Sequence, residues 1–232
     1  PPPPPHRTPR PTPPPRPPSR LSSASLIHSA ETNSLVFMVS KSCLFNVDNA
    51  TGLLGPATQC PSPNRDARPD DKEPSMIVLH GISLPPGKFG GSEIEALFTN
   101  TLEWDAHPYF EEIRGMEVSA HVLIRRDGSV VQFVPFTERA WHAGESCFRG
   151  NHRCNDFSIG IELEGEDETP YDDRQYPVLQ AVIRALCKAY PQITPRVIAG
   201  HSDIAPGRKT DPGPAFDWLR LYDGLGHRED GL

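Results

Sequence analysis

Short apolar segments, separated by proline- and glycine-rich stretches, predict a series of short strands. The run Met-Ile-Val-Leu at positions 76–79 is apolar throughout and predicts a buried strand that ends at His80. Segments 158–163 (SIGIEL) and 196–201 (RVIAGH) have the same character, and the second of them ends at His201. Each of these two histidines therefore stands at the end of a predicted strand, just before a loop.

Residues 118–135 predict a β-hairpin. Two runs rich in β-branched residues flank the dipeptide Asp127-Gly128. An Asp-Gly pair between such runs suits a two-residue type I′ turn. We therefore expect two antiparallel strands that are joined at positions 127 and 128.

Two further segments have the apolar spacing of helices. Ser92 and Glu95 have the spacing of a capping box, which predicts the start of a helix at this point. Segment 176–190 predicts a longer helix, with Pro177 in its first turn and Pro191 as its stop. The apolar faces of the two helices comprise Ile94, Leu97 and Phe98, and Leu179, Val182, Ile183, Leu186 and Tyr190.

The first 37 residues differ in composition from the rest of the chain. Residues 1–20 hold 12 of the 28 prolines and predict polyproline II or disorder. One interpretation is a ligand for SH3-type grooves, but we favour a non-native extension, with Met38 as the true start. The expected divisions are a Pro-rich extension over 1–37, an extended arm over 38–74, one folded domain over 75–225 and a tail over 226–232.

Charge and cysteine usage narrow the classes of function. A net charge of −7 argues against a nucleic-acid partner and against docking on an anionic membrane. No run approaches the roughly 18 apolar residues of a membrane span. The five cysteines are irregularly spaced, which favours reduced thiols and a cytoplasmic location. We expect no obligate protein partner.

His80, His201 and Asp211 have the residue types of a metal site. Lys209 and Asp211 are two residues apart in a stretch that prolines keep extended, so their side chains should project to the same side. Two histidines and one carboxylate form a catalytic zinc set, which leaves the fourth tetrahedral position for water. The alternative is two loop histidines and a surface ion pair, and the spacing alone does not decide between these interpretations.

Glu162 is a carboxylate inside an otherwise apolar strand. One interpretation is a general base or acid with a raised pKa beside the metal site. The other is the solvent face of a one-sided strand, which positions 160, 162 and 164 would share. Repulsion between Glu162 and Glu164 on that face is a further way to shift one of their pKa values.

A second group of candidate ligands lies further along the chain, at His142, Cys147, His152 and Cys154. Their spacings match no standard structural zinc pattern, which makes a zinc knuckle the weaker interpretation. The segment Trp-His-Ala-Gly at 141–144 has the character of a pocket wall instead. His121, on the predicted hairpin, is typical of a packed, hydrogen-bonded histidine.

Several segments closely resemble the cytoplasmic N-acetylmuramoyl-L-alanine amidases. The segments VLHGISLPPGKFGG, DAHPYF, VSAHVLIRRDG, RCNDFSIGIELEG and RKTDPGPAFDW match in order between about Thr51 and Leu221. The resemblance implies a peptidoglycan-recognition-protein-like amidase fold, an α/β (α+β) arrangement with a mixed central β-sheet flanked by helices. It implies a zinc amidase that cuts (1,6-anhydro-)N-acetylmuramic acid from L-alanine of small muropeptides in cell-wall recycling, which keeps β-lactamase induction low.

The resemblance also assigns roles to individual residues. It implies that His80, His201 and Asp211 hold one Zn²⁺ per chain. It further implies that Glu162 activates the water and that Lys209 stabilises the oxyanion. Substrate-binding roles in the sugar and peptide pocket fall to Trp141 and Arg153. Phage-lysozyme-like relatives have Cys as the third ligand, and the Asp211 position sets this chain apart from them.

The chain departs from the family pattern at two positions. Gly81 stands where the family usually has Asn, and Glu117 stands where it often has Arg. The first departure removes a hydrogen bond to substrate, and the second places a carboxylate near the peptide's own carboxylates. Other classes remain as alternatives: a catalytically silent peptidoglycan-binding module, or a scaffold that works through its Pro-rich arm.

Overall fold

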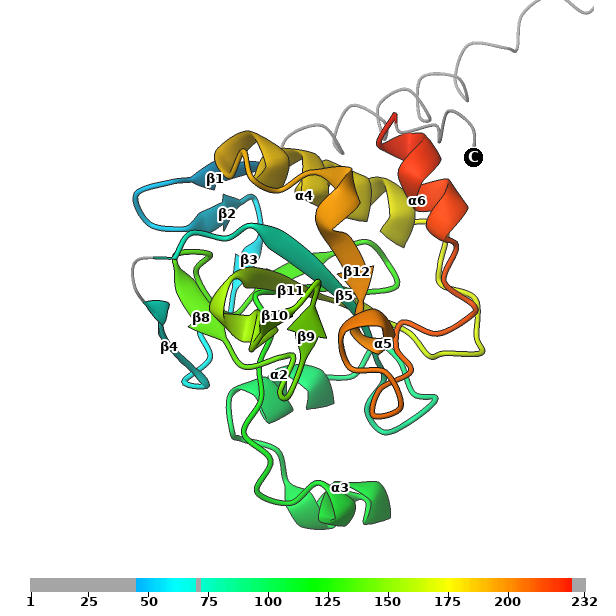
Figure 1. Ribbon diagram of the computed structural model, residues 1–232. Helices are drawn as coiled ribbons and strands as arrows, with labels where there is room; N and C mark the ends of the chain where they lie inside the picture. The colour runs from blue at the N-terminus through cyan, green and yellow to red at the C-terminus, as the bar shows by residue number, and fades with distance from the viewer. Residues whose placement is uncertain (1–44, 70–71, 227–232) are drawn as a thin grey trace, which may run out of the picture. The chain divides into compact units, whose positions relative to one another are not determined.

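The computed structural model describes residues 45–69 and 72–226 (Figure 1). The predicted Pro-rich extension, the proposed start at Met38 and the tail beyond residue 226 lie outside the described residues. Among the helices of the described part, none is long and apolar enough to cross a membrane.

A mixed six-stranded sheet forms the centre of the fold, as predicted. Its order is β12-β5-β11-β6-β7-β3, in which the β6–β7 pair is antiparallel and the other neighbours are parallel. The strands are β3 (Thr58–Gln59), β5 (Met76–Ile82), β6 (Val122–Ile124), β7 (Val130–Gln132), β11 (Ser158–Glu164) and β12 (Ile198–Gly200).

Three small antiparallel pairs lie outside this sheet. The segment before β5, predicted as an extended arm, contributes β4 and inserts the buried side chain of Arg68 into the domain. The guanidinium of Arg68 donates to the backbone oxygens of Phe136, Asn155, Asp156 and Ser158. The pairs are β1 (Asn46–Asp48) with β2 (Leu53–Gly55), β4 (Arg65–Ala67) with β8 (Glu138–Ala140), and β9 (Cys147–Phe148) with β10 (Asn151–His152).

Helices cover the sheet (Figure 1). The predicted long helix is α4 (Gln175–Ala189), with Pro177 in its first turn, and it packs with α6 (Trp218–Gly224). The apolar stripe of α4 is buried against one face of the sheet. The sheet residues of this core include Ile77, Leu79, Ile159, Ile161 and Leu163.

A second apolar cluster contains α2 (Glu93–Phe98) and α3 (Pro108–Glu112). The apolar face predicted for α2 is buried, but the predicted capping box is absent, because Ser92 makes no side-chain capping bond. The carboxylate of Glu95 instead pairs with Arg125 on the hairpin. A tertiary ion pair has therefore replaced a local contact that the spacing favoured.

The predicted hairpin forms, but its turn differs from the expectation. Gly128 N donates to Arg125 O at 2.9 Å, and Arg125 N donates to Ser129 O at 2.9 Å. The loop between the bonded residues 125 and 129 therefore has three residues. Only Gly128 has a positive φ, of 84°, whereas a type I′ turn needs two such residues. The carboxylate of Asp127 accepts a hydrogen bond from Ser129 N, which favours the wider turn.

The alternation along β5 and β11 positions the chemistry. In both strands the odd-numbered residues face α4, while His80 and Glu162 face away from it. The parallel register sets Glu162 directly opposite His80. The third predicted strand is shorter than expected, because His201 is the first residue of α5 (His201–Ile204) instead of the last residue of β12.

Candidate metal centre and pocket

His80, His201 and Asp211 come together from three separate segments. His80 lies two residues before the end of β5, His201 begins α5, and Asp211 lies in the loop between α5 and α6. Their candidate ligand atoms all lie within 4.8 Å of one another. Within residues 45–69 and 72–226, no other group of three His, Cys, Asp or Glu side chains converges in this way. The alternative knuckle around Cys147 and Cys154 is therefore not assembled.

The distances within the cluster suit a small ion. His80 Nδ1 lies 3.0 Å from His201 Nδ1, and Asp211 Oδ2 lies 3.1 Å from each of these nitrogens. Three atoms at this separation can all lie about 2.0–2.1 Å from one point, the distance at which Zn²⁺ binds imidazole nitrogen. Two imidazoles with one carboxylate favour Zn²⁺ over Mg²⁺ or Ca²⁺, which prefer oxygen ligands.

The protonation states also suit a metal. Burial lowers the pKa of His80 to about 4, against the opposing effect of the Asp211 carboxylate. Burial alone would raise the pKa of Asp211, but hydrogen bonds with His201 and His80 hold it well below its usual value. A neutral His80 and an ionised Asp211 are the forms that bind a cation.

Glu162 lies in the same pocket and is only 8% exposed. The interpretation of a solvent-facing carboxylate is wrong, because every residue of β11 is buried. Its Oε2 atom has no hydrogen-bond partner among the described residues. Burial raises the pKa of Glu162 well above its usual value, and the charge of Asp211 adds to the effect, while Lys209 opposes it.

Glu164 does not cause this pKa shift, contrary to the repulsion considered for the two carboxylates. Its own carboxylate accepts hydrogen bonds from the backbone nitrogens of Gly90 and Arg126 and pairs with Arg125. The carboxylate that raises the pKa of Glu162 is that of Asp211.

Lys209 and Asp211 line the same pocket, as the spacing predicted. Lys209 is exposed, and its backbone nitrogen donates to Ala205 O at 3.1 Å, so a turn precedes it. Its ammonium lies close enough to lower the pKa of both Glu162 and His80. Its positive charge therefore partly offsets the negative charge of the carboxylates in the pocket.

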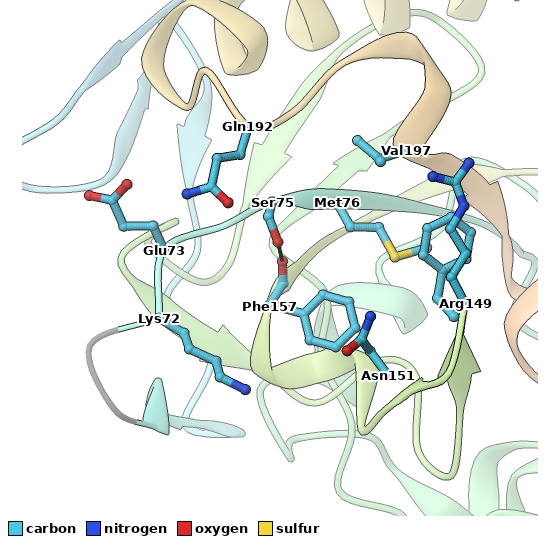
Figure 2. A pocket seen from close by; sticks show the side chains of 10 residues that line it. Lys72, Glu73, Ser75, Met76, Arg149, Asn151, Phe157, Gln192 and Val197 are labelled. Carbon is cyan, nitrogen blue, oxygen red and sulfur yellow. Dashed lines mark hydrogen bonds between the residues drawn. The ribbon is translucent and has the colours of Figure 1, made fainter.

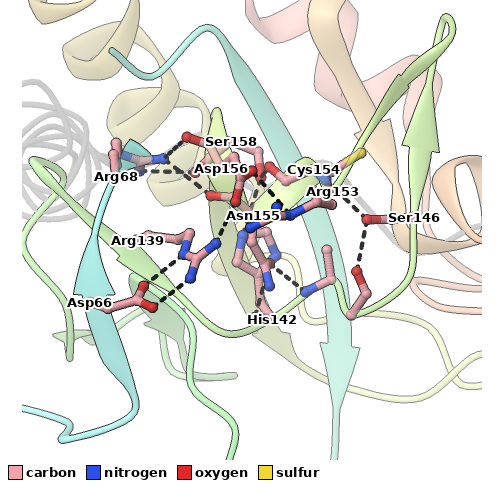
Figure 3. Close-up of polar contacts among 12 residues, drawn as sticks. Asp66, Arg68, Arg139, His142, Ser146, Arg153, Cys154, Asn155, Asp156 and Ser158 are labelled. Carbon is pink, nitrogen blue, oxygen red and sulfur yellow. Dashed lines mark hydrogen bonds and ion pairs between the residues drawn. The ribbon is translucent and has the colours of Figure 1, made fainter. Parts of the chain in front are cut away.

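Trp141 and Arg153 do not line this pocket. The indole of Trp141 contacts the carboxylate of Asp66. The side chain of Arg153 is 70% exposed and pairs with Asp156 at 3.3 Å (Figure 3). The substrate-binding roles of these two residues remain predictions.

The pocket itself is a cavity of about 470 Å³. Its lining includes the three candidate ligands, Glu162 and Lys209, together with the apolar or aromatic residues Leu84, Phe98, Tyr109 and Met116. A larger cavity, of about 570 Å³, lies elsewhere (Figure 2). Its charged residues, Lys72, Glu73 and Arg149, are all exposed, and none of the described residues that line it is a histidine. The smaller cavity is therefore the candidate active site.

The two departures from the family pattern lie differently with respect to the cavity. Gly81 lines it, and a Cβ atom at this position would lie 2.2 Å from the Tyr171 hydroxyl oxygen. That hydroxyl donates to Pro212 O at 2.9 Å, a contact that nothing in the sequence indicated. Glu117 is exposed and lies between Met116 and Val118, which line the cavity while Glu117 does not.

Known proteins resemble this chain in both sequence and structure. The model of the N-acetylmuramoyl-L-alanine amidase family matches residues 70–214. The 1,6-anhydro-N-acetylmuramyl-L-alanine amidase AmpD of Enterobacter cloacae is 61% identical over 171 residues, which cover 74% of this chain and 91% of that protein. The crystal structure of a selenomethionine AmpD derivative has a TM-score of 0.75 and 57% identity, covering 77% of this chain and 98% of the other. The solution structure of Citrobacter freundii AmpD has a TM-score of 0.57 and 55% identity, and the match covers 79% of this chain and 98% of that one.

Proposed function

The chain belongs to the N-acetylmuramoyl-L-alanine amidase family, and from this premise we propose that it is a zinc enzyme acting on 1,6-anhydromuropeptides. As a member of the family it is a hydrolase of amide bonds. The bond that we propose it cuts joins 1,6-anhydro-N-acetylmuramic acid to L-alanine. The observation that carries the proposal is the convergence of Glu162 with the cluster of His80, His201 and Asp211 in one cavity.

The ion would be held by three atoms: Nδ1 of His80, Nδ1 of His201 and Oδ2 of Asp211. When bound, Zn²⁺ supplies Lewis acidity, which lowers the pKa of a coordinated water to about 7 and polarises the amide carbonyl. The donor set supports zinc as the metal.

Glu162 is the proton carrier in this proposal. Its Oε2 atom is buried and has no hydrogen-bond partner within residues 45–69 and 72–226, and Glu162 lines the cavity, so Oε2 can accept a proton from the attacking water. The raised pKa of Glu162 brings its proton affinity closer to that of the groups with which it exchanges the proton. The same carboxyl group then donates that proton to the amine of the departing L-alanine.

Lys209 is the cation in this proposal. It lines the same cavity as the candidate ligands, and its charge acts on Glu162 and His80, so its ammonium can stabilise the negative charge that develops on the amide oxygen during attack. Groups that stabilise such an oxyanion contribute about 2.7–4 kcal/mol to catalysis in comparable sites. The apolar and aromatic residues that line the cavity provide surface on which the remainder of a small muropeptide packs.

We place this activity in the recycling of cell-wall fragments in the cytoplasm, where clearing such fragments keeps β-lactamase induction low. The similarity to AmpD proteins extends over most of their length, and the curated relative is named as a 1,6-anhydro-N-acetylmuramyl-L-alanine amidase. This similarity supports the proposal. A catalytically silent binding module would lack a ligand or the base. All three candidate ligands and Glu162 are present and line one cavity.

The direct test is turnover of a purified 1,6-anhydro-N-acetylmuramoyl tripeptide, followed by mass spectrometry. We expect two products, the free anhydro-sugar and a peptide with L-alanine at its amino terminus. The Glu162→Gln variant, loaded with zinc, is the matched control and should release neither product at an appreciable rate. Binding of the substrate by the wild-type protein without turnover would favour the silent binding module.

A further inference from the structure

His142 is a buried histidine whose ring lies against His80, outside the three candidate ligands. Its Nδ1 atom lies 2.9 Å from His80 Nε2, on the side of that ring opposite the ligand atom Nδ1. Its Nε2 atom lies 3.2 Å from Ser158 Oγ, at the start of β11. A Cβ atom at Gly160 would lie 2.5 Å from the His142 ring, so the strand has room for this ring only because position 160 is glycine.

The partners of these atoms determine where the protons lie. Ser158 Oγ donates its single proton to Cys154 O at a distance of 2.6 Å, so it can only accept a hydrogen bond from His142. His142 Nε2 must therefore carry the proton of this neutral ring, and its Nδ1 atom has a free lone pair. That lone pair accepts from His80 Nε2, which leaves His80 Nδ1 without a proton and able to bind a cation.

The second candidate histidine is fixed by the neighbouring residue. His201 Nε2 lies 3.2 Å from Ala143 O, which can only accept, so His201 also presents an unprotonated Nδ1. Asn155 holds this segment in place, because its side-chain oxygen accepts from the backbone nitrogens of His142 and Ala143 (Figure 3). Residues 142 and 143 therefore contact the outer nitrogens of both histidines.

His121 provides an internal comparison. Its Nδ1 atom accepts from Gly160 N at 3.0 Å. Its Nε2 atom lies 3.1 Å from Glu138 O, which can only accept, and 3.1 Å from Nη2 of Arg68. This is the arrangement of a structural core histidine. His142 differs, because one of its ring nitrogens contacts a candidate metal ligand, His80, and the other contacts the hydroxyl of Ser158.

We propose that His142 is a positioning residue for the metal site, which fixes the tautomer and the ring orientation of His80 through the chain Cys154 O, Ser158, His142, His80. The proposal rests on the proposed function, since it concerns the same metal. An outer hydrogen-bond partner of a ligating histidine typically changes metal affinity about 10–100-fold when it is removed. The partner here is a neutral imidazole, and its own tautomer is set by the Ser158 hydroxyl.

Leucine and asparagine at position 142 form a matched pair for the test. The two side chains have nearly the same shape, but only asparagine offers an acceptor close to the position of His142 Nδ1. We expect His142→Leu to weaken zinc binding about 10–100-fold, as measured by competition with a chelator. His142→Asn should restore most of the loss, and the metal-free melting temperatures of the two variants should be similar. Equal zinc affinities for the two variants would overturn the proposal.

The tautomers supply a second readout, and Ser158→Ala a second variant if the leucine variant does not fold. Long-range proton–nitrogen spectra of the zinc-loaded protein should show the protons of His80 and His142 on Nε2. A His142 proton on Nδ1 would overturn the proposal. Ser158→Ala should weaken zinc binding in the same direction, because it removes the acceptor that fixes the His142 proton, and an unchanged affinity would contradict this. A wild-type protein that binds no zinc would refute the proposed function itself.

Discussion

Among single residues, Glu162 shows most clearly a conflict between stability and chemistry. The part of the chain that the structure describes offers no hydrogen-bond partner to Oε2 of this buried residue, and an ionised carboxylate in such a place destabilises the fold. Its pKa in the folded chain is raised above 4.5, the usual value. The folded state therefore binds the proton more tightly than the unfolded state, and stability falls as the pH rises from the unfolded to the folded pKa.

Glu162→Gln should therefore have opposite effects on activity and stability. We expect kcat to fall about 10²–10⁴-fold, since the proton carrier is lost. At neutral pH the metal-free variant should be more stable than the metal-free wild type, by on the order of 1–3 kcal/mol, because the buried charge is removed. Thermal unfolding of both proteins between about pH 4 and about pH 8 measures this difference, which should vanish at the acidic end.

An equal melting temperature across that pH range would show that Glu162 is solvated in the folded protein. A near-normal kcat for the variant would remove Glu162 from the mechanism altogether. The two readouts are independent, so one can fail without the other.

Lys209→Gln tests the oxyanion role. Loss of one such group should lower kcat about 10²–10³-fold. Its melting temperature should change little, because Lys209 is exposed. The matched control is Lys188→Gln, an exposed lysine on α4 that does not line the cavity. If both variants kept the wild-type kcat, Lys209 would be a surface charge without a catalytic role.

At the scale of elements, the sequence predicted what periodicity determines. The apolar stripe of α4 and the buried run in β5 were predicted correctly, because burial against the sheet imposes those patterns. The capping box at Ser92 and the type I′ turn at Asp127 were wrong. Local spacing favoured both, but Glu95 pairs with Arg125 and Asp127 bonds to Ser129 instead.

The hairpin turn yields a prediction that is independent of the active site. Gly128→Ala should destabilise the protein by about 1–2 kcal/mol, because alanine is strained at a φ of 84°. Its Cβ atom would also lie 3.3 Å from Arg174 O and from Val178 Cγ2, which adds to the cost. Gly115→Ala is the control, with a φ of 78° and open space around the new atom. Denaturant unfolding should show the larger loss at Gly128, with kcat unchanged in both variants, and equal losses would mean that these contacts cost nothing.

At the scale of the whole molecule, the candidate site depends on contacts between distant segments. His80 and Glu162 could be placed near each other from strand patterns, and the register confirms that they are opposite. The contact between His142 and His80 spans 62 positions and leaves no mark in the local sequence. The same holds for the hydroxyl of Tyr171 on Pro212, since an aromatic residue in a polar loop indicates no partner.

The amino-terminal residues give a prediction at this scale. The family model begins to match only at residue 70, and the E. cloacae AmpD covers 74% of this chain. A chain that begins at Met38 should therefore keep the melting temperature and the kcat/KM of the full chain. A clear loss in either quantity would show that residues 1–37 contribute to the folded domain or to its substrate site.

The metal content of the purified protein decides whether His80, His201 and Asp211 bind a catalytic zinc ion, as we propose. Elemental analysis should find roughly one Zn²⁺ per chain in the wild type and almost none in His80→Ala or Asp211→Ala. Cys154→Ser, a change to a buried thiol outside the cluster, should keep the zinc. Zinc retained by His80→Ala but lost from Cys154→Ser would show that the metal binds elsewhere, near Cys154.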